Sequence, residues 1–241
     1  MRYQVFLEVL DKIRHESPAG IRTKYVPASS AAESVSQARA RAFIHLYLKV
    51  MFGVTDFMQR ERTIADASGD GGIDAYYIHT ETRTVHLIQS KFRVTERNFQ
   101  EKQILLEELL RMDVVRILDG ETTNDNGNKY NGKILQLQRE VSSLKDVARY
   151  SYLVVILANL KDVPSVKARQ LMGGFACEVF DFERTYRELV FPVITGTYFK
   201  AGDITIPIDL SNKNAGSKIS YNVKTKYSDC EISSPQQVLC A

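Results

Sequence analysis

The apolar positions of this chain follow two different periods, and their order predicts an α/β fold. Residues 3–14 repeat at helical spacing, and a second, longer helical stripe runs from Val35 to a stop at Gly53, with Ser29 and Ser30 as candidate N-caps. Two alternating segments at 73–79 and 84–92 flank a polar turn and predict an antiparallel hairpin. Helices and strands therefore both belong to the first half of the chain.

The middle of the chain continues this mixture. A continuous apolar run rich in β-branched residues at 152–157 is typical of a buried central strand, and a shorter strand is expected at 178–180. Segment 55–67 shows no clear period, so an irregular piece or short strand is expected there. Segment 114–118 extends a helix or stands alone, and 119–132 is expected to be an exposed loop. Further helices are expected at 98–112, 134–147, 165–172 and 182–190. Interleaved strands and helices favour a mixed sheet with helices on both faces.

The character of the sequence changes at Phe191. Thr, Ile, Gly, Pro, Asn and Ser dominate from there on, short strands are expected at 204–208 and 218–223, and no helix is visible. We therefore expect an α/β domain at 1–190 and, at 191–241, a β-rich C-terminal extension or the start of a further domain.

Composition narrows the classes of function. The chain has 241 residues, a charged fraction of 25% and a formal net charge of only +3, so nucleic-acid binding would need a local basic face. Arg39, Arg41 and Lys49 lie on the expected helix between Val35 and Val54, which has no acidic residue. Such a helix suits a phosphate backbone, although a merely solvated face fits the same pattern.

The cysteines and the apolar runs indicate the cellular compartment in which the protein is expected. Three cysteines without zinc-site spacing fit free thiols in a reducing environment. The longest apolar run is too short to span a bilayer. We expect a soluble cytoplasmic protein without membrane contact.

The candidate catalytic and metal-binding residues are concentrated in the hairpin. With the turn centred on Glu81 and Thr82, Asp74 lies opposite Gln89, and opposed side chains share a face at about 5 Å between Cβ atoms. Lys91 falls on the same face by alternation. A carboxylate, an amide oxygen and an ammonium are thus expected to converge, and a register slip of one residue would scatter them.

This donor set suits phosphodiester hydrolysis assisted by a hard cation. Mg²⁺ or Mn²⁺ prefers oxygen ligands and keeps several waters, so one or two carboxylates and a carbonyl suffice. Asp74 would be the carboxylate and Gln89 a neutral ligand, and Lys91 would hold the attacking hydroxide or the phosphate. The chain Gly69–Gly72 is followed by a strand rather than a helix, which excludes a P-loop or dinucleotide fingerprint.

The same residues carry a family resemblance. Gly-Asp-Gly-Gly-Ile-Asp at 69–74 with Gln-Ser-Lys at 89–91 resembles the signature of the PD-(D/E)XK nuclease superfamily, in its Mrr-like branch with Gln in the middle motif. The fuller phrase at 68–92 is similar to the N-terminal nuclease domain of AIPR (abortive infection phage resistance) proteins. The resemblance covers roughly residues 30–190. It implies a restriction-endonuclease-like fold, with Asp74 and Gln89 on the metal and Lys91 as the catalytic lysine.

By that resemblance, the chain is expected to be a Mg²⁺-dependent endonuclease acting on double-stranded DNA in prokaryotic phage defence (abortive infection) or restriction, with a homodimer as one possible assembly. Many Mrr-like members carry a Glu on the helix before the hairpin, where this chain has Phe43 and Ile44. Asp70 or Glu33 would then have to supply the second negative charge, with Ser90 as a further ligand. Arg93 joins the three helix cations as a candidate nucleic-acid contact.

Two alternatives remain open at this level. The missing helix Glu fits a catalytically degenerate nucleic-acid-binding domain, which would bind DNA in a salt-sensitive way without cleaving it. The β-rich C-terminal segment fits an interaction module of a defence complex, whose function would survive loss of the hairpin residues.

Overall fold

A computed structural model describes residues 2–28, 31–93, 112–159 and 174–196, together with the backbones of strands at 218–224 and 229–235. The chain divides into two compact units, Met1–Lys200 and Ala201–Ala241, so the division follows Lys200 rather than residue 190. In the second unit, β5 (Lys218–Lys224) and β6 (Asp229–Pro235) form an antiparallel pair. The strand expected at 218–223 is thus present, whereas the segment 204–208 lies outside the described residues.

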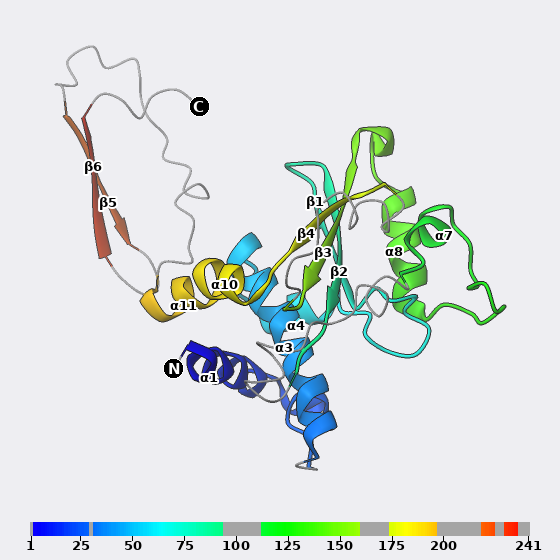
Figure 1. The fold of residues 1–241 in the computed structure, drawn as a ribbon. Coiled ribbons are helices and arrows are strands. Elements are labelled where there is room, and N and C mark those ends of the chain that lie inside the picture. The colour runs from blue at the N-terminus through cyan, green and yellow to red at the C-terminus, as the bar shows by residue number, and fades with distance from the viewer. Residues whose placement is uncertain are drawn as a thin grey trace. The chain divides into compact units, whose positions relative to one another are not determined.

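The first unit is an α/β structure built on a four-stranded mixed sheet (Figure 1). Its strands, in spatial order, are β1 (Ala75–His79), β2 (Thr84–Ser90), β3 (Ser151–Leu157) and β4 (Ala176–Val179). β1 and β2 are antiparallel with Ala75 opposite Ile88, which confirms the register predicted from the turn. β3 pairs in parallel with both β2 and β4, so it is the buried central strand that its apolar run predicted.

Helices from the N-terminal part of the chain cover one face of the sheet. They are α1 (Arg2–His15), η1 (Ala19–Ile21), α2 (Arg22–Tyr25), α3 (Ala32–Phe52) and α4 (Phe57–Glu61). Phe6 and Leu10 of α1 pack with Phe43 of α3 and with the strand residues Ile88 and Val155 in one buried cluster. Burial of these large side chains supplies most of the driving force that holds α1 and α3 on the sheet.

The opposite face is covered by α7 (Val114–Leu118) and α8 (Gly132–Ser142) (Figure 1). Ile134 and Leu137 of α8 pack there with Leu87, Val154 and Ile156 in a second buried cluster. Because successive strand residues enter opposite clusters, the sheet is sandwiched between two helical layers, as the interleaved pattern predicted.

Helix boundaries differ from expectation at several points. The N-cap of α3 is Ala31, without a side-chain hydrogen bond, so the expected serine caps are wrong, and α3 ends at left-handed Gly53 as predicted. The segment 55–67 holds α4, capped by the Asp56 side chain, which accepts from the Gln59 N–H at 2.7 Å. This short helix was missed because it is shorter than two hydrophobic repeats.

The second half shows similar shifts. α8 ends at Ser142, and Val147 belongs to a separate turn, η2 (Val147–Arg149). The segment 114–118 is a helix of its own, α7. Of the helix expected at 98–112, only non-helical Met112 is described, and the helix expected at 165–172 lies outside the described residues.

Helical structure also extends beyond the point at which the sequence predicted its end. α10 (Phe182–Thr185), capped by Asp181, continues through the π-helical turn η3 (Tyr186–Val190) into α11 (Phe191–Thr195). The expectation of no helix after Phe191 is therefore wrong. Pro192 occupies a first position of α11, where proline is tolerated because its missing N–H has no helical partner, and the wider π turn precedes it.

Candidate metal centre

The loop between α4 and β1 closes on itself at Asp74. An isolated bridge pairs Ile64 with Ala75, and the backbone carbonyl of Asp74 accepts hydrogen bonds from the N–H groups of Ala65 (2.8 Å) and Asp66 (3.0 Å). The backbone at Asp66 therefore lies next to the backbone at Asp74, and the residues between them form a closed loop. As a result, the side chains at the two ends of the loop begin from neighbouring positions.

Glycines let this loop lie against the segment that precedes α8. Gly69 and Gly71 have φ of +79° and +61°, a region that side chains disfavour. The Gly69 carbonyl accepts from Asn131 N–H at 2.8 Å, and the Gly71 carbonyl accepts from Asp113 N–H at 2.8 Å. A Cβ at Gly69 would lie 2.8 Å from the Lys129 carbonyl oxygen. The Gly-Asp-Gly-Gly sequence thus fits a tightly anchored loop.

Three carboxylates meet across this loop. Asp66, Asp70 and Asp74 can each offer an oxygen such that all three oxygens lie within 4.8 Å of one another. Each side chain is held by at least one hydrogen bond. Asp66 Oδ2 accepts from Arg41 Nε (2.7 Å), Asp70 Oδ1 from Gly72 N–H (2.8 Å) and Asp74 Oδ2 from Ser90 N–H (2.7 Å). Carboxylate oxygens held in place in this way can serve as ligands.

The second negative charge beside Asp74 therefore comes from the loop. Asp70 joins the cluster, as one of the two expected candidates, whereas Glu33 is exposed near the start of α3 and is outside the cluster formed by the described residues. Asp66 was missed because its segment shows no period. A usable signal was present, since aspartates recur at every fourth position from 66 to 74.

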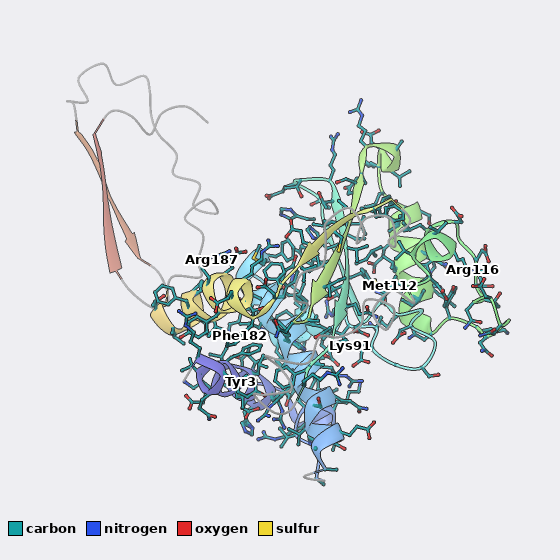
Figure 2. The ribbon with its side chains drawn as sticks, in the orientation of Figure 1. Tyr3, Lys91, Met112, Arg116, Phe182 and Arg187 are labelled. Carbon is teal, nitrogen blue, oxygen red and sulfur yellow. The ribbon has the colours of Figure 1, made fainter. Side chains whose placement is uncertain are left out.

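Lys91 directly follows Ser90, the last residue of β2, and Figure 2 shows Lys91 at that end of the strand. A cavity of about 430 Å³ is lined by Asp66, Asp74, Ser90 and Lys91 together with residues of α3. The Ser90 hydroxyl donates to the Ala40 carbonyl at 2.9 Å. The Lys91 N–H donates to the Leu157 carbonyl at 3.0 Å, so β3 fixes the backbone while the Lys91 side chain stays exposed.

Gln89 does not line this cavity among the residues that the structure describes. It is 3% exposed, its backbone pairs with Ile156 of β3, and its Oε1 is buried without a hydrogen-bond partner. β2 ends at Ser90, so the strand alternation from which a common face for Gln89 and Lys91 was predicted extends only to Ser90. Asp74 and Lys91 both line this cavity, whereas Gln89 is not among its described lining residues.

The electrostatics of the carboxylates follow from this crowding. Burial raises the pKa of Asp74 to about 7, and the neighbouring Asp66 and Asp70 act in the same direction, while Ser90 N–H and Lys91 oppose them. Burial also raises the pKa of Asp70, with Asp66 adding to the effect. Asp70 and Asp74, whose raised pKa values disfavour ionisation, would gain from a nearby cation.

The cations expected to face nucleic acid are engaged within the chain. Arg39 Nη2 lies 2.9 Å from Asp11, Arg41 Nε lies 2.7 Å from Asp66, and Lys49 Nζ lies 2.9 Å from Glu16. The acidic partners of these three cations lie on α1 and in the loops beside α3. For this reason α3 does not present a free basic face, although its segment from Val35 onward has no acid. Arg93 is half-buried, and its carbonyl accepts from the Tyr3 hydroxyl at 3.1 Å.

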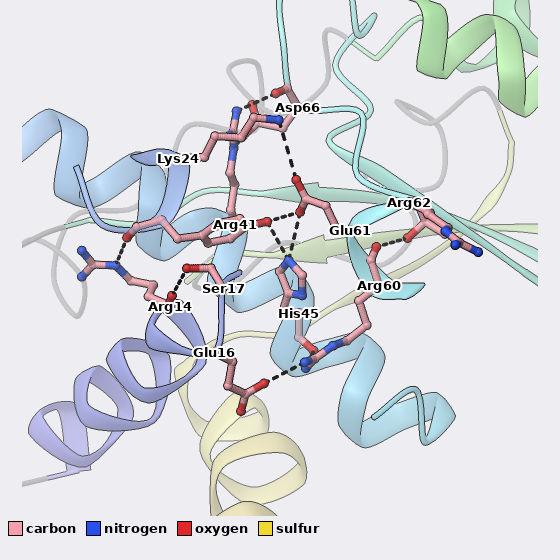
Figure 3. A network of polar contacts seen from close by, with 12 residues as sticks. Arg14, Glu16, Ser17, Lys24, Arg41, His45, Arg60, Glu61, Arg62 and Asp66 are labelled. Carbon is pink, nitrogen blue, oxygen red and sulfur yellow. Dashed lines mark hydrogen bonds and ion pairs between the residues drawn. The ribbon is translucent and has the colours of Figure 1, made fainter. Parts of the chain in front are cut away.

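A second polar network lies beside the carboxylates (Figure 3). The Tyr25 hydroxyl donates to Glu61 and lies 2.7 Å from Nε2 of buried His45, which is 3.3 Å from Glu61. Buried Arg60 pairs with Glu16 at 2.8 Å. Burial lowers the pKa of His45, so the neutral imidazole with its proton on Nε2 is the form that serves both neighbours. This network fixes α4 against α3.

The donor set fits a hard divalent cation. Carboxylate oxygens are the ligands that Mg²⁺ and Mn²⁺ prefer, and the three here are held by hydrogen bonds from α3, from β2 and from the loop itself. No helix within the described ranges is both long and apolar enough to cross a bilayer. Comparison of the chain with protein-family models, curated sequences and solved structures gives no match, so the interpretation of this centre depends on its geometry and sequence.

Proposed function

We propose that the first unit is a metal-dependent endonuclease that hydrolyses phosphodiester bonds. The observation that carries the proposal is the convergence of Asp66, Asp70 and Asp74 within 4.8 Å, in a loop beside the exposed Lys91. Carboxylates that cluster for structural reasons are normally paired with cations. Here only Asp66 has an ion-pair partner among the described residues, which is Arg41.

Asp66, Asp70 and Asp74 would hold Mg²⁺ or Mn²⁺. The cation would stabilise negative charge on the phosphate and lower the pKa of an attacking water. The structural requirement for the chain is to keep the carboxylate oxygens in place, which the Ser90 N–H, the Gly72 N–H and Arg41 do.

Lys91 would contact the substrate directly. Its ammonium has no ion-pair partner among the described residues, and it lines the cavity that contains Asp74. An ammonium there can donate to a phosphate oxygen and neutralise the charge that develops on it. It can also orient a water for attack, since an ammonium has three donors and no acceptor.

The finer assignments are part of the same proposal. The resemblance of 69–74 and 89–91 to PD-(D/E)XK nucleases supports a restriction-endonuclease-like fold, double-stranded DNA as substrate and a defence or restriction role in the cytoplasm. In this chain, Asp66 and Asp70 would compensate for the missing helix Glu. Gln89 would then be a buried neighbour of the centre rather than a ligand. The second unit, which follows Lys200 and contains β5 and β6, would be an accessory to this domain.

The deciding experiment measures cleavage of plasmid DNA, linear DNA and RNA with Mg²⁺ and with Mn²⁺. We expect Lys91→Ala and Asp66→Asn to lower the cleavage rate by roughly 10²-fold or more, because each removes a group that contacts the phosphate or the cation. Glu33→Gln is the matched control, since it removes a carboxylate outside the cluster.

Two results would contradict the proposal. Equal cleavage by wild type and Lys91→Ala would exclude Lys91 from the reaction. Metal-independent, salt-sensitive binding with no cleavage of any substrate would instead identify a degenerate nucleic-acid-binding domain.

A further inference from the structure

A second cavity adjoins the carboxylate cluster. It has a volume of about 520 Å³ and shares Arg41, Asp66 and Ala67 with the first cavity. The two cavities therefore adjoin at these shared wall residues. A ligand that reaches the carboxylates could therefore extend into the second cavity.

Besides Arg41, three cations line the second cavity from separate parts of the chain. They are Lys24 of α2, Arg62 just after α4 and Lys133 of α8, which we call the basic groove. The Lys24 side chain is 54% exposed and its Nζ lies 3.8 Å from Glu61. Lys133 Nζ donates to the Arg62 carbonyl at 2.7 Å. The Arg62 guanidinium has no ion pair among the described residues and extends away from the neighbouring polar network (Figure 3).

The acids in this cavity are already engaged. Glu61 accepts from Tyr25 and lies 3.3 Å from His45, while Asp66 is paired with Arg41. With Arg41 balanced by Asp66 and Lys24 by Glu61, the charges of Arg62 and Lys133 are left without a carboxylate partner among the described residues. The basic groove is therefore net positive beside an acidic centre.

We propose that the basic groove binds the sugar–phosphate backbone of the nucleic-acid strand whose scissile phosphate lies at the carboxylate cluster. This inference rests on the proposed function. Lys24 and Arg62 are exposed and Lys133 is half-buried, and cations placed in this way on separate segments suit successive phosphates of one strand. Ile21 and Met58, which is 40% exposed, line the same cavity and offer apolar surface to sugars or bases. The basic groove thus takes the role that the paired Arg39, Arg41 and Lys49 do not fill.

The test compares two double variants of the full chain. Arg62→Gln with Lys133→Gln removes the two unbalanced charges of the basic groove. Lys145→Gln with Arg149→Gln is the matched control, because it also removes one Lys and one Arg but lies before the start of β3, at the opposite end of that strand from Leu157. Both residues of the control pair are exposed.

Binding of short duplex DNA, single-stranded DNA and single-stranded RNA is measured by fluorescence anisotropy in EDTA, over a range of salt concentrations. We expect the groove variant to bind its preferred nucleic acid roughly tenfold more weakly at moderate salt, with a salt slope lower by about 2. The control variant should bind as the wild type does. The preferred probe identifies the strand type.

A groove variant that binds all three probes as tightly as the wild type would overturn the inference, and so would an equal loss in both double variants. Binding of fluorescently labelled polyglutamate, without binding of any nucleic acid, would assign the groove to an acidic polypeptide instead. The two proposals fail separately. If the wild type never cleaves but the groove variant binds nucleic acid more weakly, the basic groove is supported and the nuclease is rejected. If the wild type cleaves and the groove variant binds unchanged, the nuclease is supported and the basic groove is rejected.

To exclude misfolding, thermal unfolding of each variant is followed by circular dichroism. Arg62→Gln alone serves as the second variant, because the Arg62 side chain has no hydrogen bond or ion pair among the described residues. It should retain the wild-type unfolding midpoint and lower the salt slope by about 1. An unchanged slope for this variant counts against the basic groove.

Discussion

Asp74 combines deep burial with a charge that the metal-free chain does not balance. Its pKa rises from the ordinary value near 4 to about 7, chiefly through burial. A carboxyl group with a raised folded-state pKa adds stability below its unfolded pKa, and this contribution is lost as the pH rises through the folded value. Above about pH 7, ionised Asp74 therefore opposes folding.

Asp74→Asn should stabilise the metal-free protein at about pH 8 by about 2–4 kcal/mol, while it abolishes metal binding. An asparagine can still accept the Ser90 N–H, which lies 2.7 Å from the Asp74 carboxylate in the wild type. The measurement is denaturant unfolding in EDTA, with calorimetric titration of Mn²⁺. The difference in stability should vanish near pH 4. Glu33→Gln should change neither quantity, and a destabilised Asp74→Asn would contradict the account.

His86 gives the opposite dependence on pH. Burial lowers its pKa to about 4, and its ring packs against Phe52 at 4.8 Å between centroids. In the unfolded chain it takes up a proton near pH 6.5, so its contribution to stability is lost as the pH falls from about 6.5 to about 4.

The expected loss is up to about 3 kcal/mol. Asp74 titrates in the same pH range and changes the free energy of unfolding in the opposite direction. The informative quantity is therefore the difference in the free energy of unfolding between wild type and His86→Gln. That difference should shrink as the pH falls from 7 to 4. A constant difference across this range would show that His86 packs without titrating.

Single residues were predictable from sequence where a local rule applied. Asp74 and Lys91 follow from the hairpin register and the motif spacing, and both line the first cavity. The ion pairs of Arg39 and Arg41 involve partners 28 and 25 residues away, so no local pattern could show that these cations are engaged. Asp66 enters the cluster through a loop closure, which is a tertiary feature.

At the scale of elements, the carboxylate loop depends on its glycines. Gly69→Ala should destabilise the protein by about 1–3 kcal/mol, because an alanine would adopt a left-handed backbone and its Cβ would meet the Lys129 carbonyl. The displaced loop should also weaken Mn²⁺ affinity through Asp70. Chemical unfolding and calorimetry measure the two effects.

Gly127→Ala is the matched control for this prediction. Gly127 has φ of +77° but no neighbour within 4 Å of an added Cβ, so this variant introduces backbone strain without the collision. It should lose less stability than Gly69→Ala and leave metal affinity unchanged. Equal losses in the two variants would show that strain alone accounts for the effect at Gly69.

Element identity was more predictable than element boundaries. The hairpin and central strand have strong period-two or continuous apolar patterns, and the observed register agrees with the predicted one. α4 is too short to show a helical repeat. α11 has a composition that favours strands, yet it continues from η3 because the preceding helical turns supply the carbonyl groups that its first N–H groups need.

At the scale of the whole molecule, both buried clusters lie within the first unit. A chain ending at Lys200 should therefore fold by itself, with an unfolding midpoint and Mn²⁺ affinity equal to those of the full chain. Circular dichroism and calorimetry on the shortened chain provide the test. A molten or insoluble product would show that residues 201–241 contribute to the fold of the first unit.

The closure of the carboxylate loop on the Asp74 carbonyl has a consequence for the order of folding. Asp66, Asp70 and Asp74 come together through one short loop, whereas the pairing of β2 with β3 joins residues 67 positions apart. Closing a short loop costs less chain entropy, so the carboxylates can meet before the central sheet is complete. A divalent cation could then bind to a partly folded chain. Its binding would speed folding, and the cation would already occupy the site when folding is complete.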